Sequence, residues 1–439
     1  MVKNKALLIL IIASFILPLG YSFLYRIEPV VDAQAYDRIA VNLISGNGFK
    51  EDASKTFKFD TAIVRAGPGY EFFLAGIYEV FDNRYEAVWI VQAILHALSA
   101  LLLFVICCRL FSANGETVGL ITAGIFGLHP DLIEISAMLM TETVYLFLII
   151  LAVYIFVRSF EKSKSLILAA FLGLTIGFAI LTRLPVALFI PVIIWMYAKS
   201  KSYRSAAVFL GAMIVILAPW TIRNYLIFHQ FIPTTLIGSY NVWIGNRLGT
   251  DGGQIAGGFN PVTAYTDIYG FFGLKAKANA EFWSFISGHP FLFIKLCAIR
   301  VVRYFSLIRP MGFWFYQTGS KQLIFVGSSF IAIAVLFISG FSGMLIAMRE
   351  RRAVFYYLST FAAIAPLVLI PTVVQSRYRF QIYPFLSIFG GYYIVQLYHR
   401  FPNSKKILAG VVGVLIFISL LDAIAAWPII IDRFHHFIV

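Results

Sequence analysis

Long apolar runs recur along this chain, and they constrain its fold more than any other feature. Residues 6–25 form the first run. Ten further runs follow, at about 86–108, 116–131, 139–158, 166–182, 185–198, 205–226, 323–348, 353–371, 381–398 and 407–427. A helix needs about 20 apolar residues to cross the roughly 30 Å hydrocarbon core of a bilayer. The runs predict an all-α integral membrane protein with about eleven transmembrane helices, give or take one, because several runs are short.

Composition excludes a soluble globular protein. Of the 439 residues, 60% are hydrophobic and only 13% are charged, and the mean hydropathy is +0.84. Soluble domains are far more polar than this. The first apolar run follows the basic start MVKNK and has no small-residue cleavage site before Arg26. It is therefore interpreted as a retained first span and not as a removed signal peptide.

The net charge of +14 is distributed like a membrane topology signal. Lys and Arg punctuate the apolar runs instead of forming one basic domain, so nucleic acid is not expected as a partner. With the N-terminus inside, four short basic loops fall on the cytoplasmic side, as the positive-inside rule requires. These loops contain Arg158/Lys162/Lys164, Lys199/Lys201/Arg204, Arg349/Arg351/Arg352 and Arg400/Lys405/Lys406. The C-terminus is then expected outside.

Two long segments, residues 26–85 and 227–320, then lie on the outer face of a single polytopic membrane domain, residues 1–439. Neither is apolar enough to span the bilayer nor polar enough to be a free linker, so both are expected to carry short interfacial helices. The second segment contains a glycine-rich stretch at 238–258. Because this stretch lacks the lysine of a phosphate loop and follows no strand, a mobile outer loop is favoured over a nucleotide site.

The first outer segment opens with a predicted helix in VVDAQAYDRIAVNLISGNGF, residues 30–49. Asp32 is expected to be its N-cap, with Val31 and Tyr36 packed together across the first turn. Apolar residues recur every four positions, at Ala35, Ile39 and Leu43, and Gly46 or Gly48 would end the helix. Asp37 is expected to be solvated, and Tyr36 to fix the helix in place.

Charged side chains gather at the predicted outer ends of the spans. They are Arg65, Glu142, Arg183, Arg223, Arg377 and Arg379. Each arginine alone is explained by snorkelling to the lipid headgroups. Five arginines on the outer face, against the positive-inside tendency, instead suggest an anionic ligand there. Guanidinium groups bind phosphate oxygens in a bidentate manner, so a phosphate is the ligand that these residue types favour.

Five stretches of sequence occur in a fixed order along the chain. They are RAGPGYEFFLAGIYEVF at 65–81, MTETVYLF at 140–147, LTRLPVALFIP at 181–191, PWTIRNY at 219–225 with the following FIPTTLIGSYNVWIGN up to 246, and SRYRFQIYP at 376–384. In this order they resemble bacterial members of glycosyltransferase family 39, relatives of the protein O-mannosyltransferases and of the aminoarabinose transferase that modifies lipid A. The resemblance implies a C-type glycosyltransferase fold, in which the first outer loop bears interfacial helices and the catalytic acid.

Residue by residue, the resemblance assigns the catalytic aspartate to Asp32, for which a plain N-cap role is the alternative. Many relatives have an Asp-Glu pair here, whereas Ala33 follows in this chain, so adjacent twin carboxylates are excluded. The resemblance also implies a sugar donor on a polyprenyl phosphate. Asp32 would be the general base, with inversion, and arginines would stabilise the departing phosphate. Arg377 and Arg379 are the preferred donor phosphate ligands, followed by Arg223, Arg183 and Arg65.

Two glutamates keep alternative assignments. Glu71 stands where the family usually has proline, and it is either an accessory acid or, as the favoured interpretation, a surface charge. Glu142 would bind a metal, order the first outer loop, or merely lie beside a helix cap at Thr141. No cofactor is certain and a divalent metal is possible. His435 and His436 have no acids at ligand spacing, so a metal site is not expected there.

Together these features predict a membrane glycosyltransferase. It would move a hexosyl or pentosyl group from a polyprenyl-phosphate-linked donor to a glycan, lipid or protein acceptor of the cell envelope. Transfer would occur at the non-cytoplasmic face of a bacterial cytoplasmic (inner) membrane. A transporter or flippase of an anionic lipid-linked substrate is the alternative, since it would also present outward arginines. Such transporters usually have repeated halves, and no repeat is visible in this sequence.

Overall fold

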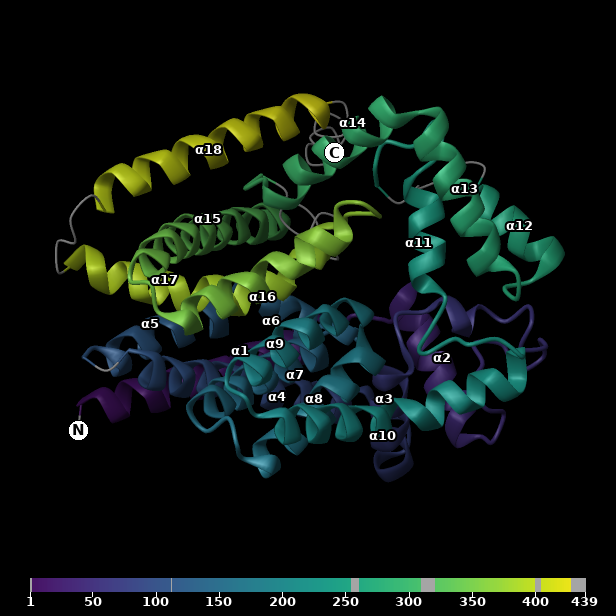
Figure 1. Cartoon of the computed structure of the whole chain (residues 1–439), viewed down its shortest axis with the longest axis horizontal. Helices are drawn as coiled ribbons and strands as arrows, with labels where there is room; N and C mark the ends of the chain where they lie inside the picture. Colours follow the sequence, from purple (N-terminus) through teal and green to yellow (C-terminus); the bar gives the residue numbers. More distant parts are fainter. Residues whose placement is uncertain (1, 112, 254–259, 309–319, 399–403, 428–439) are drawn as a thin grey trace.

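A computed structural model describes residues 2–111, 113–253, 260–308, 320–398 and 404–427. The described residues are all-helical, as the sequence predicts. The N-terminal half supplies α1 (Val2–Tyr25), α4 (Tyr85–Leu110), α5 (Gly115–Gly127), α6 (Pro130–Ser136), α7 (Thr141–Glu161), α8 (Leu166–Thr182), α9 (Phe189–Lys199) and α10 (Tyr203–Phe228). The C-terminal half supplies α15 (Ser320–Arg349), α16 (Ala353–Leu369), α17 (Tyr383–Tyr398) and α18 (Ser404–Ala425). In Figure 1 the first group forms the lower layer of the bundle and the second group the upper layer.

Shorter helices occupy the two segments that the sequence places outside the membrane. The first segment carries α2 (Asp32–Ile44), the 3₁₀ helix η1 (Thr61–Val64) and α3 (Pro68–Phe81). The second carries α11 (Ile237–Gly245), α12 (Pro261–Tyr269), α13 (Leu274–Gly288) and α14 (Pro290–Phe305). Two further 3₁₀ helices, η2 (Leu184–Leu188) and η3 (Ser376–Ile382), lead into α9 and α17. Figure 1 shows α2, α11, α12 and α13 gathered at the end of the molecule opposite the N-terminus.

Every apolar run that the sequence predicts falls on a helix. Among the described residues, six helices are long and apolar enough to cross a membrane, namely those ending at Tyr25, Leu110, Glu161, Phe228, Arg349 and Ala425. The run at 116–131 falls on α5 and α6, which are bent by 58°. The runs at 166–182, 185–198 and 353–371 fall on shorter apolar helices. A second bent pair, α13 and α14 at 105°, would bring the number of spans to eight and lies in the segment predicted to be outside.

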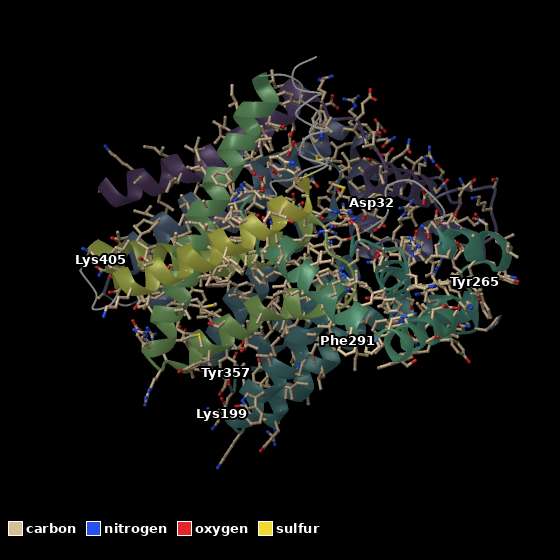
Figure 2. The ribbon with its side chains drawn as sticks, turned by 90° about the horizontal axis from the view of Figure 1, so that it is seen from above. Asp32, Lys199, Tyr265, Phe291, Tyr357 and Lys405 are labelled. Atoms are coloured by element: carbon tan, nitrogen blue, oxygen red, sulfur yellow. The ribbon has the colours of Figure 1, made fainter. Side chains whose placement is uncertain are left out.

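Two lysines of the predicted cytoplasmic loops lie far from the end that carries α2 and α12. Figure 2 shows Lys405 at the side of the molecule opposite Asp32 and Tyr265, with Lys199 also distant from Tyr265. Between these ends, large apolar side chains such as Ile9 of α1 and Phe417 of α18 are exposed by more than half of their area. Apolar side chains exposed around the flank of a bundle are typical of lipid contact.

The helix α2 begins differently from the sequence prediction. Asp32 is its first helical residue, and the N-cap is Val31, whose φ of 52° places it outside the helix without any side-chain cap bond. Val31 is 71% exposed while Tyr36 is 3% exposed. The predicted N-cap role of Asp32 and the predicted contact of Val31 with Tyr36 are therefore wrong, because the Asp32 carboxylate is held by arginines. The apolar stripe is confirmed, since Ala35 and Ile39 are completely buried.

Two other expectations need correction. Asp37 is not simply solvated, because its carboxylate accepts hydrogen bonds from Tyr78 Oη at 2.6 Å and from Tyr85 Oη at 3.0 Å. These bonds tie α2 to α3 and α4. The glycine-rich stretch predicted as a loop is helical over its first part, because α11 runs to Gly245. Residues 254–259 of that stretch lie outside the described residues.

A close backbone contact brings the first outer segment onto the bundle. A β carbon at Gly67 would overlap the carbonyl oxygen of Leu181, and one at Gly69 would crowd the backbone of Thr182. Only glycine allows the start of α3 to approach the end of α8 this closely. The contact places Arg65, just before α3, near Arg183, just after α8.

Candidate active site

Asp32 lies between two arginines at the end of the bundle that carries α2 and α11. Its Oδ1 accepts a hydrogen bond from Arg65 Nη1 at 3.2 Å, and its Oδ2 accepts one from Arg377 Nη2. The three residues come from the first turn of α2, the residue after η1 and the first turn of η3. The side chain of Arg377 is 7% exposed and that of Asp32 is 23% exposed. The aspartate therefore remains accessible while its arginine partner is buried.

A second carboxylate, that of Glu142, binds two arginines, Arg183 and Arg377. Its Oε1 forms an ion pair with Arg183 Nη1 and lies 3.8 Å from Arg377 Nε. Arg183 Nη1 also donates to Thr141 Oγ1 at 3.3 Å. The N-cap of α7 is Met140, without a side-chain cap bond. The assignment of Glu142 as the neighbour of a cap at Thr141 is therefore wrong, and Glu142 instead orients two of the predicted arginines.

Tyr378 packs between these arginines. Its ring centre lies 5.3 Å from the Arg183 guanidinium and 5.6 Å from the Arg377 guanidinium. A guanidinium over an aromatic face is stabilised electrostatically. The aromatic ring therefore helps two like charges to lie near each other in a partly dry site.

Glu51 completes the cluster, although the sequence reasoning missed it. Its Oε2 accepts hydrogen bonds from Arg65 Nη2 at 2.7 Å and Nε at 3.1 Å. The loop is shaped by Asp60, whose buried carboxylate accepts the backbone N–H groups of Glu51 at 2.9 Å and of Asp52 at 2.8 Å. Several acids shortly before Arg65 were the available signal, but spacing within a loop does not fix which acid reaches an arginine.

The arginines keep the Asp32 carboxylate ionised. Burial opposes ionisation, but the charge and hydrogen bond of Arg377, followed by the charges of Arg65 and Arg183, outweigh burial and lower the pKa of Asp32. Burial likewise opposes the charged form of Arg377, yet Asp32 and Glu142 raise its pKa. Burial and the nearby Asp32 charge raise the pKa of Tyr36 well above its usual value. At neutral pH the cluster therefore contains ionised Asp32, cationic arginines and a neutral Tyr36.

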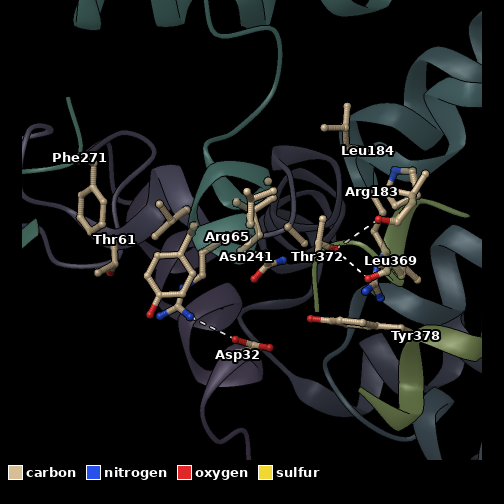
Figure 3. A pocket seen from close by; sticks show the side chains of 18 of the residues that line it. Asp32, Thr61, Arg65, Arg183, Leu184, Asn241, Phe271, Leu369, Thr372 and Tyr378 are labelled. Atoms are coloured by element: carbon tan, nitrogen blue, oxygen red, sulfur yellow. Dashed lines mark hydrogen bonds and ion pairs between the residues drawn. The ribbon is translucent and has the colours of Figure 1, made fainter. Parts of the chain in front are cut away.

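A cavity of about 890 Å³ opens over this cluster. Figure 3 shows the charged residues Asp32, Arg65 and Arg183, together with Tyr378, among its lining side chains. A second wall is apolar and is formed by Leu184, Pro185, Ala187, Leu188, Val368 and Leu369. A third wall comes from the outer segments and includes Lys55, Phe59, Thr61, Tyr240, Asn241, Thr263, Asp267 and Phe271. The cavity thus joins an anion-binding region to an apolar wall and a mixed polar and aromatic wall.

Two of the predicted phosphate ligands do not line this cavity. Arg379 is 1% exposed, donates to the Ser306 carbonyl at 2.8 Å and packs on Phe337. Arg223 donates to Asn224 Oδ1 at 2.9 Å, and its guanidinium lies 4.8 Å from the Trp220 ring centre. Three more aromatic rings, of Phe49, Phe57 and Phe228, lie within 6 Å of the same guanidinium. The structure brings together Arg65, Arg183 and Arg377 and separates Arg223 and Arg379 from them.

Glu71 is buried, contrary to its favoured assignment as a surface charge. It is 0% exposed, and within the described part of the chain neither carboxylate oxygen has a hydrogen-bond partner. Burial raises the pKa of Glu71 to about 8. Glu71 is therefore a protonated acid at neutral pH, and it is not among the residues that line the cavity.

The carboxylates of the site are committed to guanidinium groups. Asp32, Glu51 and Glu142 each bind at least one arginine. In the described ranges no group of three His, Cys, Asp or Glu side chains is placed to hold a metal ion. This donor set does not fit a metal. His435 and His436 lie outside the described residues.

Comparison with known families confirms part of the resemblance. Residues 65–222 match the family of dolichyl-phosphate-mannose-protein mannosyltransferases. The matched segment includes Arg65, Glu142 and Arg183, whereas Asp32 and Arg377 lie outside it. The comparison with curated proteins gave no match.

Solved structures share the fold of the chain. The oligosaccharyltransferase of Archaeoglobus fulgidus in the apo form is similar with a TM-score of 0.56 and 13% identity, over 97% of this chain and 55% of its own. ArnT of Cupriavidus metallidurans in the apo state has a TM-score of 0.55 and 15% identity, over 93% of this chain and 62% of its own. ArnT of the same organism bound to undecaprenyl phosphate has a TM-score of 0.51 and 16% identity, over 93% of this chain and 63% of its own. The chain thus has the C-type glycosyltransferase fold and spans 55% to 63% of the length of these structures.

Proposed function

We propose that this chain is an inverting membrane glycosyltransferase that moves a sugar from a polyprenyl-phosphate donor to an acceptor hydroxyl. The observation that carries the proposal is Asp32 between Arg65 and Arg377 in the wall of a cavity that also has an apolar side. A lipid phosphate has two parts, an anionic head and an apolar tail, and this cavity offers a surface for each. Undecaprenyl phosphate is bound by ArnT, which has the same fold.

In the proposed reaction the bond between the sugar C1 and the phosphate oxygen breaks, and the phosphate keeps the electron pair. The acceptor oxygen forms the new bond to C1 from the opposite side. Its proton passes to a carboxylate oxygen of Asp32. Arg377, Arg183 and Arg65 stabilise the negative charge that grows on the phosphate, because preorganised cations in a site of low polarity act strongly on developing charge.

The resting geometry of Asp32 suggests how the donor prepares the base. With both oxygens bound to arginines, the carboxylate has a lowered pKa and is a weak proton acceptor. Phosphate oxygens compete for the same guanidinium groups. When Arg377 and Arg65 turn toward the phosphate, Asp32 loses its compensating charges and its pKa rises. Glu142 and Glu51 would keep Arg377 and Arg65 anchored during this exchange.

We place the reaction at the non-cytoplasmic face of a bacterial cytoplasmic (inner) membrane. The support is the charge pattern, since Lys199 and Lys405 lie on the side of the molecule away from Asp32 (Figure 2). The positive-inside rule then puts the Asp32 end outside. The acceptor would be a glycan, lipid or protein of the cell envelope.

The test is transfer by the purified protein, supplied with radiolabelled polyprenyl-phosphate sugars and a membrane extract as the acceptor source. Transfer of label by the wild type, abolished in Asp32→Asn, is expected. Absence of transfer with every donor, together with movement of the labelled lipid across a vesicle membrane, would instead identify a flippase.

A further inference from the structure

Arg300 of α14 is completely buried although it carries a charge. Its Nε donates to the Gly252 carbonyl at 2.9 Å, and its Nη2 donates to the Gly245 carbonyl. Its Nη1 donates to Asn246 Oδ1 at 3.0 Å and to the Ile370 carbonyl at 3.1 Å. These four acceptors are neutral oxygens, so among the described residues this guanidinium serves as a multiple hydrogen-bond donor and not as half of an ion pair.

Three of the four acceptors of Arg300 lie close in sequence to residues that line the cavity. Gly245 and Asn246 lie at the end of α11, three and four residues after Val242, the last of the five α11 residues that line the cavity. Ile370 lies in the turn after α16, in which Leu369 and Thr372 line the cavity. Figure 3 shows Asn241 of α11 and Thr372 of the turn after α16 among the lining side chains. The two segments therefore meet on one side chain.

Two further contacts close this junction, which we call the Arg300 seam (Gly245, Asn246, Arg300 and residues 370–372). Asn246 Nδ2 donates to the Pro371 carbonyl at 2.9 Å. A β carbon at Gly245 would overlap the carbonyl oxygen of Thr372. The end of α11 can approach the turn this closely only because residue 245 is glycine.

Stability alone does not account for a buried arginine at this point. Removing a guanidinium from water is costly, and well-packed apolar side chains often stabilise a fold as well as buried polar groups do. What arginine supplies is geometry, because its planar fork carries five N–H donors in fixed directions. One rigid group can thereby set the distance between three backbone segments.

We infer that Arg300 is a positioning residue that fixes the width of the cavity between Asn241 of α11 and Thr372, two polar lining residues, and that the acceptor binds on this polar side. This inference rests on the proposed transferase function. The phosphate ligands Arg65, Arg183 and Arg377 are anchored separately by Glu51 and Glu142. Loosening the seam therefore changes the acceptor side of the cavity more than the phosphate side.

The experiment compares Arg300→Lys and Gly245→Ala with the control Lys295→Met in the full-length protein. Lys295 is exposed on the same helix. Hydrogen–deuterium exchange of residues 237–245 and 369–372 measures the seam without requiring activity. Faster exchange of both segments is expected in both seam variants and unchanged exchange in the control. Lysine keeps the charge but lacks the planar fork, so wild-type exchange in Arg300→Lys would overturn the positioning role.

Kinetics and binding then separate positioning from general damage. An increase of about tenfold in the acceptor KM, equivalent to about 1.4 kcal/mol, is expected in both seam variants. Affinity for polyprenyl phosphate is expected to stay within about twofold of the wild type, as for interactions that are independently anchored. If the affinity for polyprenyl phosphate falls by the same factor as the acceptor KM rises, the inference is overturned. If wild-type protein transfers no sugar, the proposed function fails, whereas the exchange result still tests the seam.

Discussion

Arg377 donates a hydrogen bond to the carboxylate of Asp32, a residue 345 positions earlier in the chain. This contact connects the first outer helix to the 3₁₀ helix before α17 and so closes the site. The same guanidinium lies 3.8 Å from Glu142. Arg377 thus lies between two of the carboxylates of the site, those of Asp32 and Glu142.

Replacing Asp32 by asparagine is expected to reduce sugar transfer by about 10²- to 10⁴-fold, the usual contribution of a positioned general base. Asparagine keeps the shape and an acceptor oxygen but cannot take the proton. Initial rates with saturating donor measure the effect. Asp37→Asn is the matched control on the same helix, because Asp37 binds Tyr78 and Tyr85 away from the cavity. A full transfer rate in Asp32→Asn would exclude Asp32 as the base.

Arg377→Ala is expected to weaken binding of labelled polyprenyl phosphate by about ten- to 100-fold, since a hydrogen bond to a charged group contributes about 1.5–3 kcal/mol. Arg379→Ala should instead lower the melting temperature with little change in this affinity, because Arg379 binds the Ser306 carbonyl inside the fold. Equilibrium binding to the detergent-solubilised protein distinguishes the two. Similar losses of affinity in both variants would mean that the phosphate contacts η3 differently.

The Glu142 and Arg183 pair is expected to show strong coupling in a double-mutant cycle. Glu142→Gln alone leaves Arg183 without its carboxylate partner and Arg377 with Asp32 only. Removing one partner of a buried ion pair typically destabilises a fold by on the order of 3–5 kcal/mol. Arg183→Met removes one of those charges, so the double variant should recover part of the stability. Thermal unfolding of the four proteins measures the coupling. Additive losses would show that the ion pair contributes nothing beyond its separate side chains.

Glu71 should make the protein less stable as the pH rises. Its pKa is raised from 4.5 to about 8 in the folded state, so the folded form binds a proton that the unfolded form releases. The associated stability is fully present below about pH 4.5 and is lost progressively up to about pH 8, where the folded-state acid also ionises. Glu71→Gln should flatten the melting temperature between pH 5 and pH 8, roughly the window in which the two states differ. An unchanged slope in this variant would show that Glu71 is solvated.

Sequence patterns predicted the parts of this protein that depend on local composition. Each apolar run corresponds to a helix, because burying or solvating a stretch in lipid requires apolar side chains over its whole length. The apolar stripe of α2 was correct for the same reason, since Ala35 and Ile39 repeat with the period of a helix. The position of Asp32 at the start of that helix was also visible, although its role as N-cap was not correct.

The grouping of the charged residues was decided only by the tertiary structure. Arg377 and Arg379 are two residues apart and look equivalent in sequence, yet one side chain reaches Asp32 and the other the Ser306 carbonyl. Glu51 and Glu71 are both acids near Arg65, yet one binds its guanidinium and the other is buried without a hydrogen bond among the described residues.

Sequence by itself therefore determined the class of the protein, its helices and the residue types available for phosphate chemistry. The tertiary structure decided which carboxylate faces which arginine, where the cavity lies and that Arg300 joins the end of α11 to the turn after α16. The physical reason is the separation along the chain over which each interaction acts. Hydropathy and helix periodicity act between neighbours in the chain, whereas an ion pair between positions 32 and 377 exists only after the whole bundle has packed.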